Sequence, residues 1–116
     1  MTRLKFTNAI FRGGWDCEDD VYYSFELTKE DIIFVDAFLY ANYDVDGFEG
    51  SAHVVFVGVD GDLYEVFGSH CSCFGLEDQW DIEITSVEYY LNRKEIGLKV
   101  DDELMEVLLE YQEFVK

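Results

Sequence analysis

One hairpin signal in the middle of the chain constrains the fold more than any other feature. Residues Ala52–Val59 are almost all apolar and rich in β-branched side chains, with His53 as the exception. The dipeptide Asp60-Gly61 follows, and then a second run, Leu63–Phe67. An Asp-Gly pair between two such runs predicts a tight β-hairpin. Because the first run is apolar on both faces, we expect it to be a central strand.

The N-terminal half offers further strands and one short helix. Residues Val21–Leu27 alternate apolar and polar side chains, which predicts a half-buried strand. Thr28 precedes an acidic turn and is a plausible N-cap, so we expect a short helix there, followed by a strand near Phe38–Val45. Leu4–Phe11 is a weaker strand candidate that ends before Gly13-Gly14.

The C-terminal half predicts a loop and then a helix. Gly68–Gly75 is interpreted as a loop. Thr85 and Glu88 have the spacing of a capping box and predict a helix that runs to about Lys94. Gly97 is expected to stop that helix.

A last helix is predicted to begin at Asp101-Asp102-Glu103, whose charges suit the positive end of a helix dipole. Its expected buried stripe has helical spacing and consists of Leu104, Leu108, Tyr111 and Val115. The fold class that follows is α+β. Residues 1–116 should form a single domain, an antiparallel sheet of about four to six strands with the C-terminal helices packed on one face.

The charge of the chain restricts its partners. It has 116 residues, 26 of them acidic and 8 basic, for a formal net charge of −18. Solubility of a small domain needs a net charge of only about 2 to 8 in magnitude. A field of this sign disfavours direct contact with nucleic acid or an anionic membrane and favours a basic partner. The alternative is a halophilic or merely well-solvated protein.

The acidic residues of the last helix form a row. Its members are Glu103, Glu106, Glu110 and Glu113. They fall within an arc of roughly 80° and rise by about 4.5 to 6 Å per step. Duplex DNA carries a charge about every 3.4 Å per strand, so the spacings are comparable. Arginine binds carboxylate and phosphate with the same bidentate geometry. We therefore expect this row to bind a partner's cations.

A second candidate contact cluster consists of Asp16, Glu18, Asp19 and Asp20. Acidic residues in turns and on outer helix faces often serve only solvation, and that interpretation stays open for each cluster. The common sign of the clusters favours the functional interpretation. A helix that needed only solvation would mix Glu with Lys, for about 0.2 to 0.5 kcal/mol per pair.

The cysteines and histidines raise the question of a metal. The three cysteines, without a secretion signal, are typical of a reducing cytoplasm. His70, Cys71 and Cys73 offer three zinc ligands, and Cys17 or His53 offers a fourth. Structural zinc sites rarely place one residue between cysteines, so a tight loop with packed thiols is the preferred interpretation.

Catalysis is not expected. A nucleophile built from Cys73 and His70 lacks an orienting third group, and acidic surroundings raise the pKa of a thiol. The chain also has no phosphate-binding loop, dinucleotide fingerprint or metalloprotease motif. The sequence therefore predicts a protein with no enzymatic activity, no cofactor and no membrane span, and it leaves the oligomeric state open.

Residues 68–80, with the sequence GSHCSCFGLEDQW, and residues 62–66, with the sequence DLYEV, carry a resemblance. This block resembles one found in small acidic bacteriophage-encoded proteins of unassigned function. The similarity as a whole extends beyond the block, over about a third of the chain. The resemblance implies a phage origin, and hence the cytoplasm of an infected bacterial host. It implies no particular site residue.

Together, charge and resemblance predict a phage-encoded, non-enzymatic inhibitor of a host defence complex. It would act as an acidic DNA mimic that occupies the basic groove of a nucleic-acid-binding protein, in an anti-CRISPR or anti-restriction role. Two alternatives remain. One is a phage structural or interaction protein that binds through an apolar surface, and the other is a small zinc-binding protein.

Overall fold

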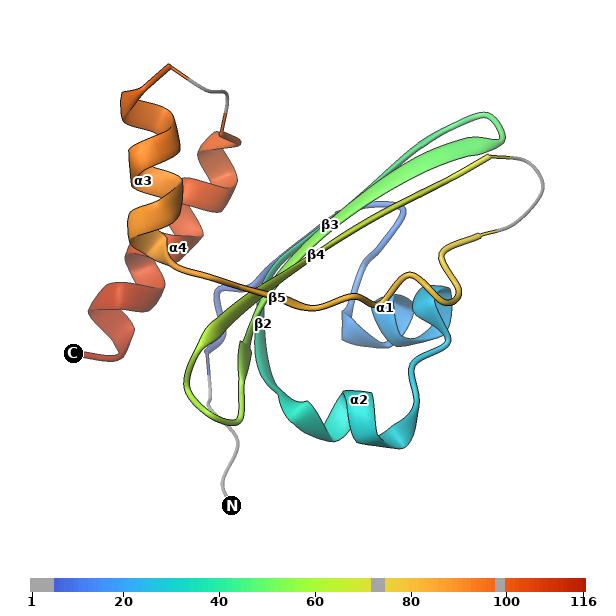
Figure 1. Ribbon diagram of the computed structural model, residues 1–116, viewed down its shortest axis with the longest axis horizontal. Helices are drawn as coiled ribbons and strands as arrows, with labels where there is room; N and C mark the ends of the chain where they lie inside the picture. The colour runs from blue at the N-terminus through green and yellow to red at the C-terminus, as the bar shows by residue number, and fades with distance from the viewer. Residues whose placement is uncertain (1–5, 72–74, 98–99) are drawn as a thin grey trace.

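Five strands form one sheet in the order β1-β2-β3-β4-β5 within the described residues, 6–71, 75–97 and 100–116, of the computed structural model (Figure 1). The strands are β1 (Ile10–Gly13), β2 (Val35–Asp46), β3 (Glu49–Gly58), β4 (Leu63–His70) and β5 (Glu83–Thr85). The helices are α1 (Glu18–Phe25), α2 (Lys29–Phe34), α3 (Val87–Glu95) and α4 (Asp102–Phe114). Helices α3 and α4 lie on one side of the sheet, and α1 and α2 lie on the other.

The hairpin prediction is confirmed. β3 is the central strand and pairs in antiparallel fashion with β2 and β4. The turn into β4 contains Gly61 at φ +87°, a conformation that glycine adopts without strain. The Asp60 carboxylate accepts the backbone N–H of Asp62 at 3.1 Å and closes this turn. Val54–Val57 is completely buried, as expected for a strand covered on both faces.

The sheet has five strands, within the predicted four to six, and all its strand pairs except one are antiparallel as predicted. β1 pairs with β2 in parallel, because the chain passes through α1 and α2 between them. β1 begins at Ile10, later than the predicted strand Leu4–Phe11, of which residues 4 and 5 lie outside the described part of the chain.

The predicted strand Val21–Leu27 is wrong, because these residues belong mostly to α1. Val21 and Phe25 are buried and stand four residues apart, as on one face of a helix. Tyr23, which alternation had placed beside them, is 86% exposed. The turn before α1 is stabilised by Asp20, whose carboxylate accepts the backbone N–H of Asp16 at 2.7 Å.

Helix α2 begins where the sequence indicated. The Thr28 hydroxyl accepts the backbone N–H of Asp31 at 3.2 Å, and the Asp31 carboxylate accepts the N–H of Thr28 in return. The predicted loop Gly68–Gly75 starts too early, because β4 continues to His70 and pairs there with Gly50. Residues 72–74 of that prediction lie outside the described chain.

The two C-terminal helices form nearly as predicted. The N-cap of α3 is Ser86, one residue later than the predicted capping residue Thr85, which pairs with Leu63 as part of β5. The N-cap of α4 is Asp101, and its carboxylate accepts backbone N–H groups of the first turn. Val115 is wrong as a member of the buried stripe, because it follows the end of α4 and is 51% exposed.

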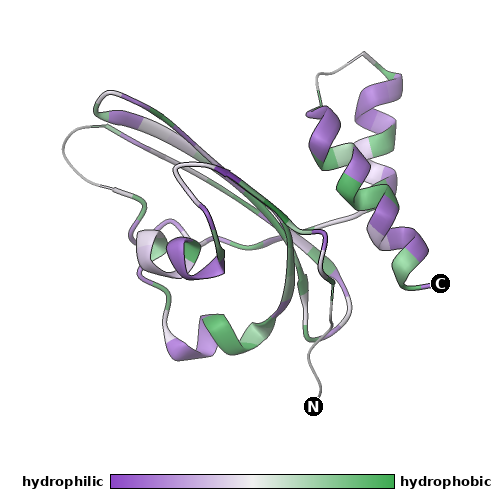
Figure 2. Ribbon diagram, turned by 180° about the vertical axis from the view of Figure 1, so that it is seen from behind, coloured by the Kyte–Doolittle hydropathy of each residue, from purple (hydrophilic) through white to green (hydrophobic). Residues whose placement is uncertain are grey.

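Alternate side chains of the sheet enter two cores. On the α3/α4 side, Val55 belongs to a buried cluster with Leu108, and on the α1/α2 side Phe56 belongs to another with Val21 and Trp15. Hydrophobic residues run along the strands and alternate with hydrophilic ones on α3 and α4 (Figure 2). Because both cores share one sheet, the chain is a single α+β domain. Among the described residues, no helix has the length and hydrophobicity needed to cross a membrane.

Candidate interaction surface

The acidic side chains face outward. All 26 lie within the described residues, and only Glu65 among them is buried. Those that are half-buried are Asp20, Asp31, Asp36, Glu77 and Asp101. The remainder are exposed, and they occur on both sides of the sheet and at its turns. The negative charge is therefore a property of the folded surface.

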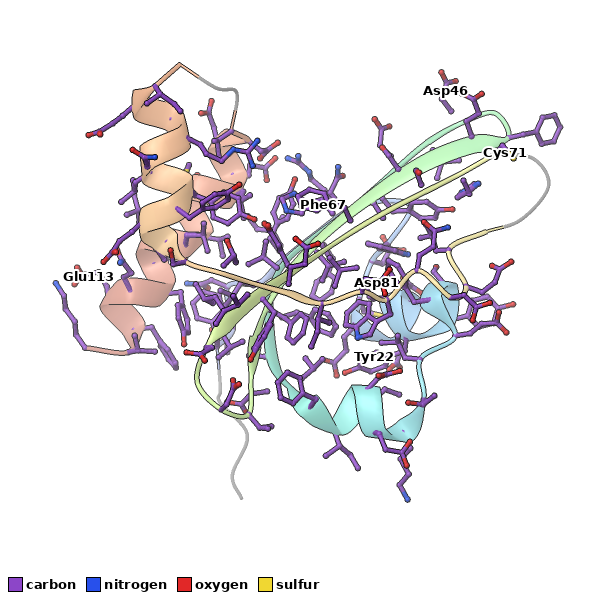
Figure 3. The ribbon with its side chains drawn as sticks, viewed as in Figure 1. Tyr22, Asp46, Phe67, Cys71, Asp81 and Glu113 are labelled. Atoms are coloured by element: carbon purple, nitrogen blue, oxygen red, sulfur yellow. The ribbon has the colours of Figure 1, made fainter. Side chains whose placement is uncertain are left out.

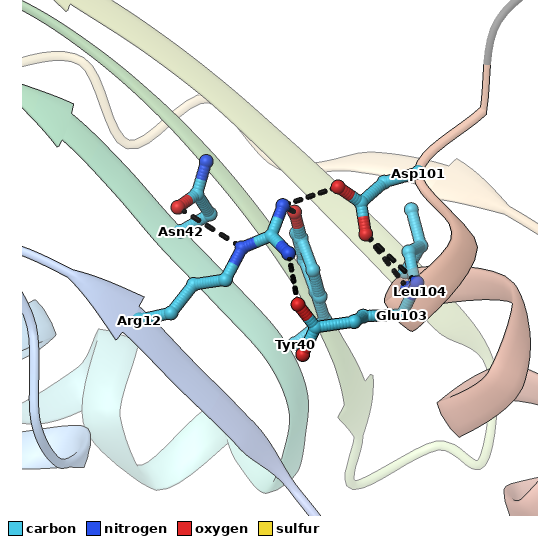
Figure 4. A network of polar contacts seen from close by, with 6 residues as sticks. All are labelled: Arg12, Tyr40, Asn42, Asp101, Glu103 and Leu104. Carbon is cyan, nitrogen blue, oxygen red and sulfur yellow. Dashed lines mark hydrogen bonds and ion pairs between the residues drawn. The ribbon is translucent and has the colours of Figure 1, made fainter.

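Arg12 is the main internal cation of this surface (Figure 4). It leaves β1 toward α4, where its guanidinium forms ion pairs with Asp101 and with Glu103, the latter at 2.6 Å. It also donates to the Tyr40 hydroxyl at 2.7 Å and to the Asn42 side-chain oxygen at 3.2 Å. Arg12 therefore fastens the start of α4 to β1 and β2.

The charges of this network change the pKa of its members. Burial opposes ionisation of Asp101, but the hydrogen bond and charge of Arg12, with backbone N–H groups, outweigh it and hold the pKa of Asp101 below its ordinary value. Burial also raises the pKa of Tyr40 to about 12. Near neutral pH, Asp101 is therefore ionised and accepts hydrogen bonds, and the Tyr40 hydroxyl keeps its proton.

The predicted row on α4 is exposed but is not uniform. Glu103 is bound by Arg12, and Glu113 forms an exposed ion pair with Lys116 at 3.0 Å. Glu106 and Glu110 form no ion pair with any Lys or Arg of the described chain. They border a hollow of about 370 Å³ opposite the segment before and into β1. Within the described residues, the two central glutamates of the row are thus the ones without a Lys or Arg ion pair.

The second predicted cluster lies at the start of α1, on the other side of the sheet. Asp16, Glu18 and Asp19 are exposed. Asp20 is half-buried, and its carboxylate accepts backbone N–H groups of the turn, so its role is structural. Glu18 borders a second hollow, of about 400 Å³, together with Phe6, Thr7, Ala9 and Phe11.

The two hollows meet along one segment of chain, because both are lined by Ala9. Carboxylates from opposite sides of the sheet, Glu18 on one and Glu106 with Glu110 on the other, therefore flank Thr7–Phe11. We call Thr7–Phe11 and these three glutamates the β1-edge surface. Glu106 and Glu110 of the predicted row on α4 and Glu18 of the second predicted cluster thus lie around the same edge. Sequence spacing did not indicate this proximity.

His70 and Cys71, two of the candidate zinc ligands, lie away from the β1-edge surface. His70 contacts the Tyr43 hydroxyl through Nε2, and its Nδ1 lies 3.1 Å from the carbonyl oxygen of Cys71. Cys71 and Cys17 are exposed, and Cys73 lies outside the described residues. The described residues contain no group of three or more His, Cys, Asp or Glu side chains placed to hold a metal ion. Cys71 and Asp46 lie at one end of the sheet, far from Glu113 (Figure 3).

A buried polar cluster was missed by the sequence analysis. The Tyr90 hydroxyl donates to the buried Glu65 carboxylate and lies 3.2 Å from Nε2 of His53. Burial opposes ionisation of Glu65, but contact with His53, whose Nε2 lies 3.9 Å from the carboxylate, outweighs it together with the Tyr90 hydrogen bond and the charge of Arg93, and the pKa of Glu65 is lowered. His53 itself is half-buried and stacks on Phe67 at 4.3 Å between ring centroids.

One signal for this cluster was present in the sequence. Glu65 has the same strand parity as Leu63, which alternation places toward the core. A carboxylate at an inward position needs a donor, and the donor, Tyr90, comes from α3 on a different part of the chain. A small pocket of about 170 Å³ beside it is bordered by Phe67 and Arg93.

Searches of protein-family models, of curated proteins and of solved structures find no match to this chain. The fold and the surface define it as a small acidic α+β domain, with a carboxylate-flanked sheet edge that is unpaired within residues 6–71, 75–97 and 100–116.

Proposed function

We propose that this chain is a non-enzymatic inhibitor that occupies the cationic groove of a nucleic-acid-binding protein. One observation supports it most. Among the described residues, only Arg12 and Lys116 form Lys or Arg ion pairs with carboxylates, and only one acidic side chain is buried. The excess negative charge therefore faces solvent and is available to a basic partner.

The β1-edge surface is the proposed contact. Its glutamates belong to α1 and α4, so the fold fixes their positions, which would not be the case in a flexible tail. A fixed array binds with less loss of conformational entropy than a disordered acidic segment. The contact should form quickly at low salt and weaken as salt rises, because the Debye length falls from about 30 Å at 0.01 M to about 8 Å at 0.15 M.

The proposed setting is a bacterial cell infected by a phage, where the target is a defence complex that binds nucleic acid. A CRISPR effector or a restriction enzyme has the required cationic groove. The proposed partner is thus a basic host protein, and no direct contact with nucleic acid is involved.

The experiment has two stages. The tagged chain is used to capture proteins from bacterial lysate at low salt, and the captured protein is identified and purified. The chain should then displace a labelled DNA duplex from that protein, and excess duplex should displace the chain. Capture of a protein that binds both the chain and DNA at once would contradict the proposal.

A matched pair of variants tests the surface. Glu106→Lys with Glu110→Lys should reduce displacement at least tenfold, by the loss of two charge contacts and the gain of repulsion. Asp44→Lys with Asp46→Lys makes the same change in net charge on the exposed β2–β3 hairpin. This control variant should retain most of the ability to displace the DNA duplex. Equal loss in both variants would show that net charge, rather than this surface, determines binding.

A further inference from the structure

The outer edge of β1 is unpaired within the described chain, since β1 stands at one end of the sheet order. Gly14 donates its backbone N–H to the carbonyl of Tyr43 on β2 at 2.8 Å. Because backbone groups alternate in direction along a strand, those of Phe11 point away from β2. An edge of this kind is a template for another extended chain.

The side chains of β1 show how an added strand would be oriented. Ile10 packs with the core on the α3/α4 side, and Phe11 packs with the core on the α1/α2 side. A strand added beside β1 would alternate in the same way. One of its residues would point toward Glu106 and Glu110, and its neighbour toward Glu18.

We infer that an extended segment of the basic partner pairs with β1 as an added strand and places adjacent cationic side chains on opposite faces of the sheet. This inference rests on the proposed function and specifies its partner: a segment with at least two neighbouring Lys or Arg residues. Main-chain hydrogen bonds supply one part of the affinity, and the flanking glutamates supply selectivity for the cations.

Charge disfavours the obvious competitor for this edge, a second copy of the chain. A second copy of the chain could pair β1 with β1, but each copy carries −18, and the glutamates that flank the edge would approach one another. A basic segment would instead be attracted by the glutamates that flank the edge. The occupant that fits both the backbone and the charge is therefore a cationic extended peptide.

The test uses a defined peptide. The probe is a labelled, acetylated and amidated peptide, Thr-Val-Lys-Arg-Val-Thr, and its binding is measured by fluorescence anisotropy at low salt. The control peptide is N-methylated at Lys and Arg, which keeps both charges and removes backbone donors on both of its edges. We expect the control to bind about tenfold or more weakly. We also expect the probe to slow hydrogen exchange of the Phe11 amide.

The outcomes separate this inference from the proposed function. If both peptides bind equally and the Phe11 amide exchanges at its free rate, strand addition is wrong, while displacement of DNA from the captured protein can still hold. If the chain dimerises in solution and protects the same amide, the edge belongs to a second copy and the inference is also wrong. Loss of probe binding in Glu106→Lys with Glu110→Lys, but not in Asp44→Lys with Asp46→Lys, supports it.

Discussion

Replacing Arg12 by Gln should destabilise the domain, because one guanidinium joins β1, β2 and the start of α4. The side chains of Arg12 and Asp101 are 30% and 33% exposed, and that of Glu103 is 54% exposed. Hydrogen bonds to charged groups contribute about 1.5 to 3 kcal/mol when shielded, and exposed ion pairs about 0.2 to 1 kcal/mol. Taking the lower part of the first range for Asp101 and the middle of the second for Glu103 gives about 2 kcal/mol.

The assay is urea and thermal unfolding followed by circular dichroism. A loss of about 2 kcal/mol should lower Tm by about 8 °C for a domain of this size. Lys29→Gln is the matched control, because it makes the same change in net charge at an exposed position of α2. Arg12→Lys keeps the positive charge but loses the planar guanidinium that donates to several acceptors at once. Its free energy of unfolding should therefore lie between those of the wild type and Arg12→Gln.

The pH dependence gives a second measurement. The pKa of Asp101 is lowered in the folded state, so its stabilising effect is present above the ordinary Asp value of about 3.9 and is lost as pH falls through the folded value. The difference in free energy of unfolding between the wild type and Arg12→Gln should therefore have its maximum value at pH 7 and shrink below about pH 4. If Arg12→Gln and Lys29→Gln unfold within about 0.5 kcal/mol of each other, the reasoning is refuted.

Three further predictions concern stability. Gly13 and Gly61 both have positive φ, so an alanine at either position is strained. A Cβ at Gly13 would also lie 2.1 Å from a backbone oxygen, whereas one at Gly61 would meet nothing within 4 Å. Gly13→Ala should therefore cost at least about 1 kcal/mol more than Gly61→Ala in urea unfolding, because only Gly13→Ala adds a steric clash. Tyr90→Phe removes a donor from the buried Glu65 and should cost about 1 to 3 kcal/mol at pH 7. Because the folded pKa of Glu65 is lowered, that cost should shrink below about pH 4, and a cost independent of pH would contradict it. Thr28→Ala should cost about 1 kcal/mol, and an unchanged urea midpoint would show that its cap is not needed.

The parts of the fold that were predictable depend on local signals. The central hairpin follows from two apolar runs and a turn dipeptide, which act within a few residues of one another. The cap at Thr28 and the start of the last helix near Asp101 are also local signals, and both were predicted. Helix α1 was missed because Val21, Tyr23 and Phe25 fit a strand by alternation, while Val21 and Phe25 alone fit a helix.

The candidate surface was predictable only in part, because its geometry comes from contacts between distant segments. Helical spacing placed Glu106 and Glu110 on the outer face of α4, and both are exposed. Spacing did not reveal that a β1 residue, Arg12, neutralises Glu103, since 91 residues separate them. Nor did it reveal that Glu18, from the other side of the sheet, borders the same edge.

The parallel pairing of β1 with β2 has a consequence for how the domain folds and opens. Strands β2, β3 and β4 are joined by tight turns and can pair early, whereas β1 meets residues about 30 positions further along the chain. Closing so long a loop costs entropy before any contact repays it, so β1 should join the sheet late and leave it first. The strand that offers the proposed contact edge, β1, is thus also one that local fluctuations release readily.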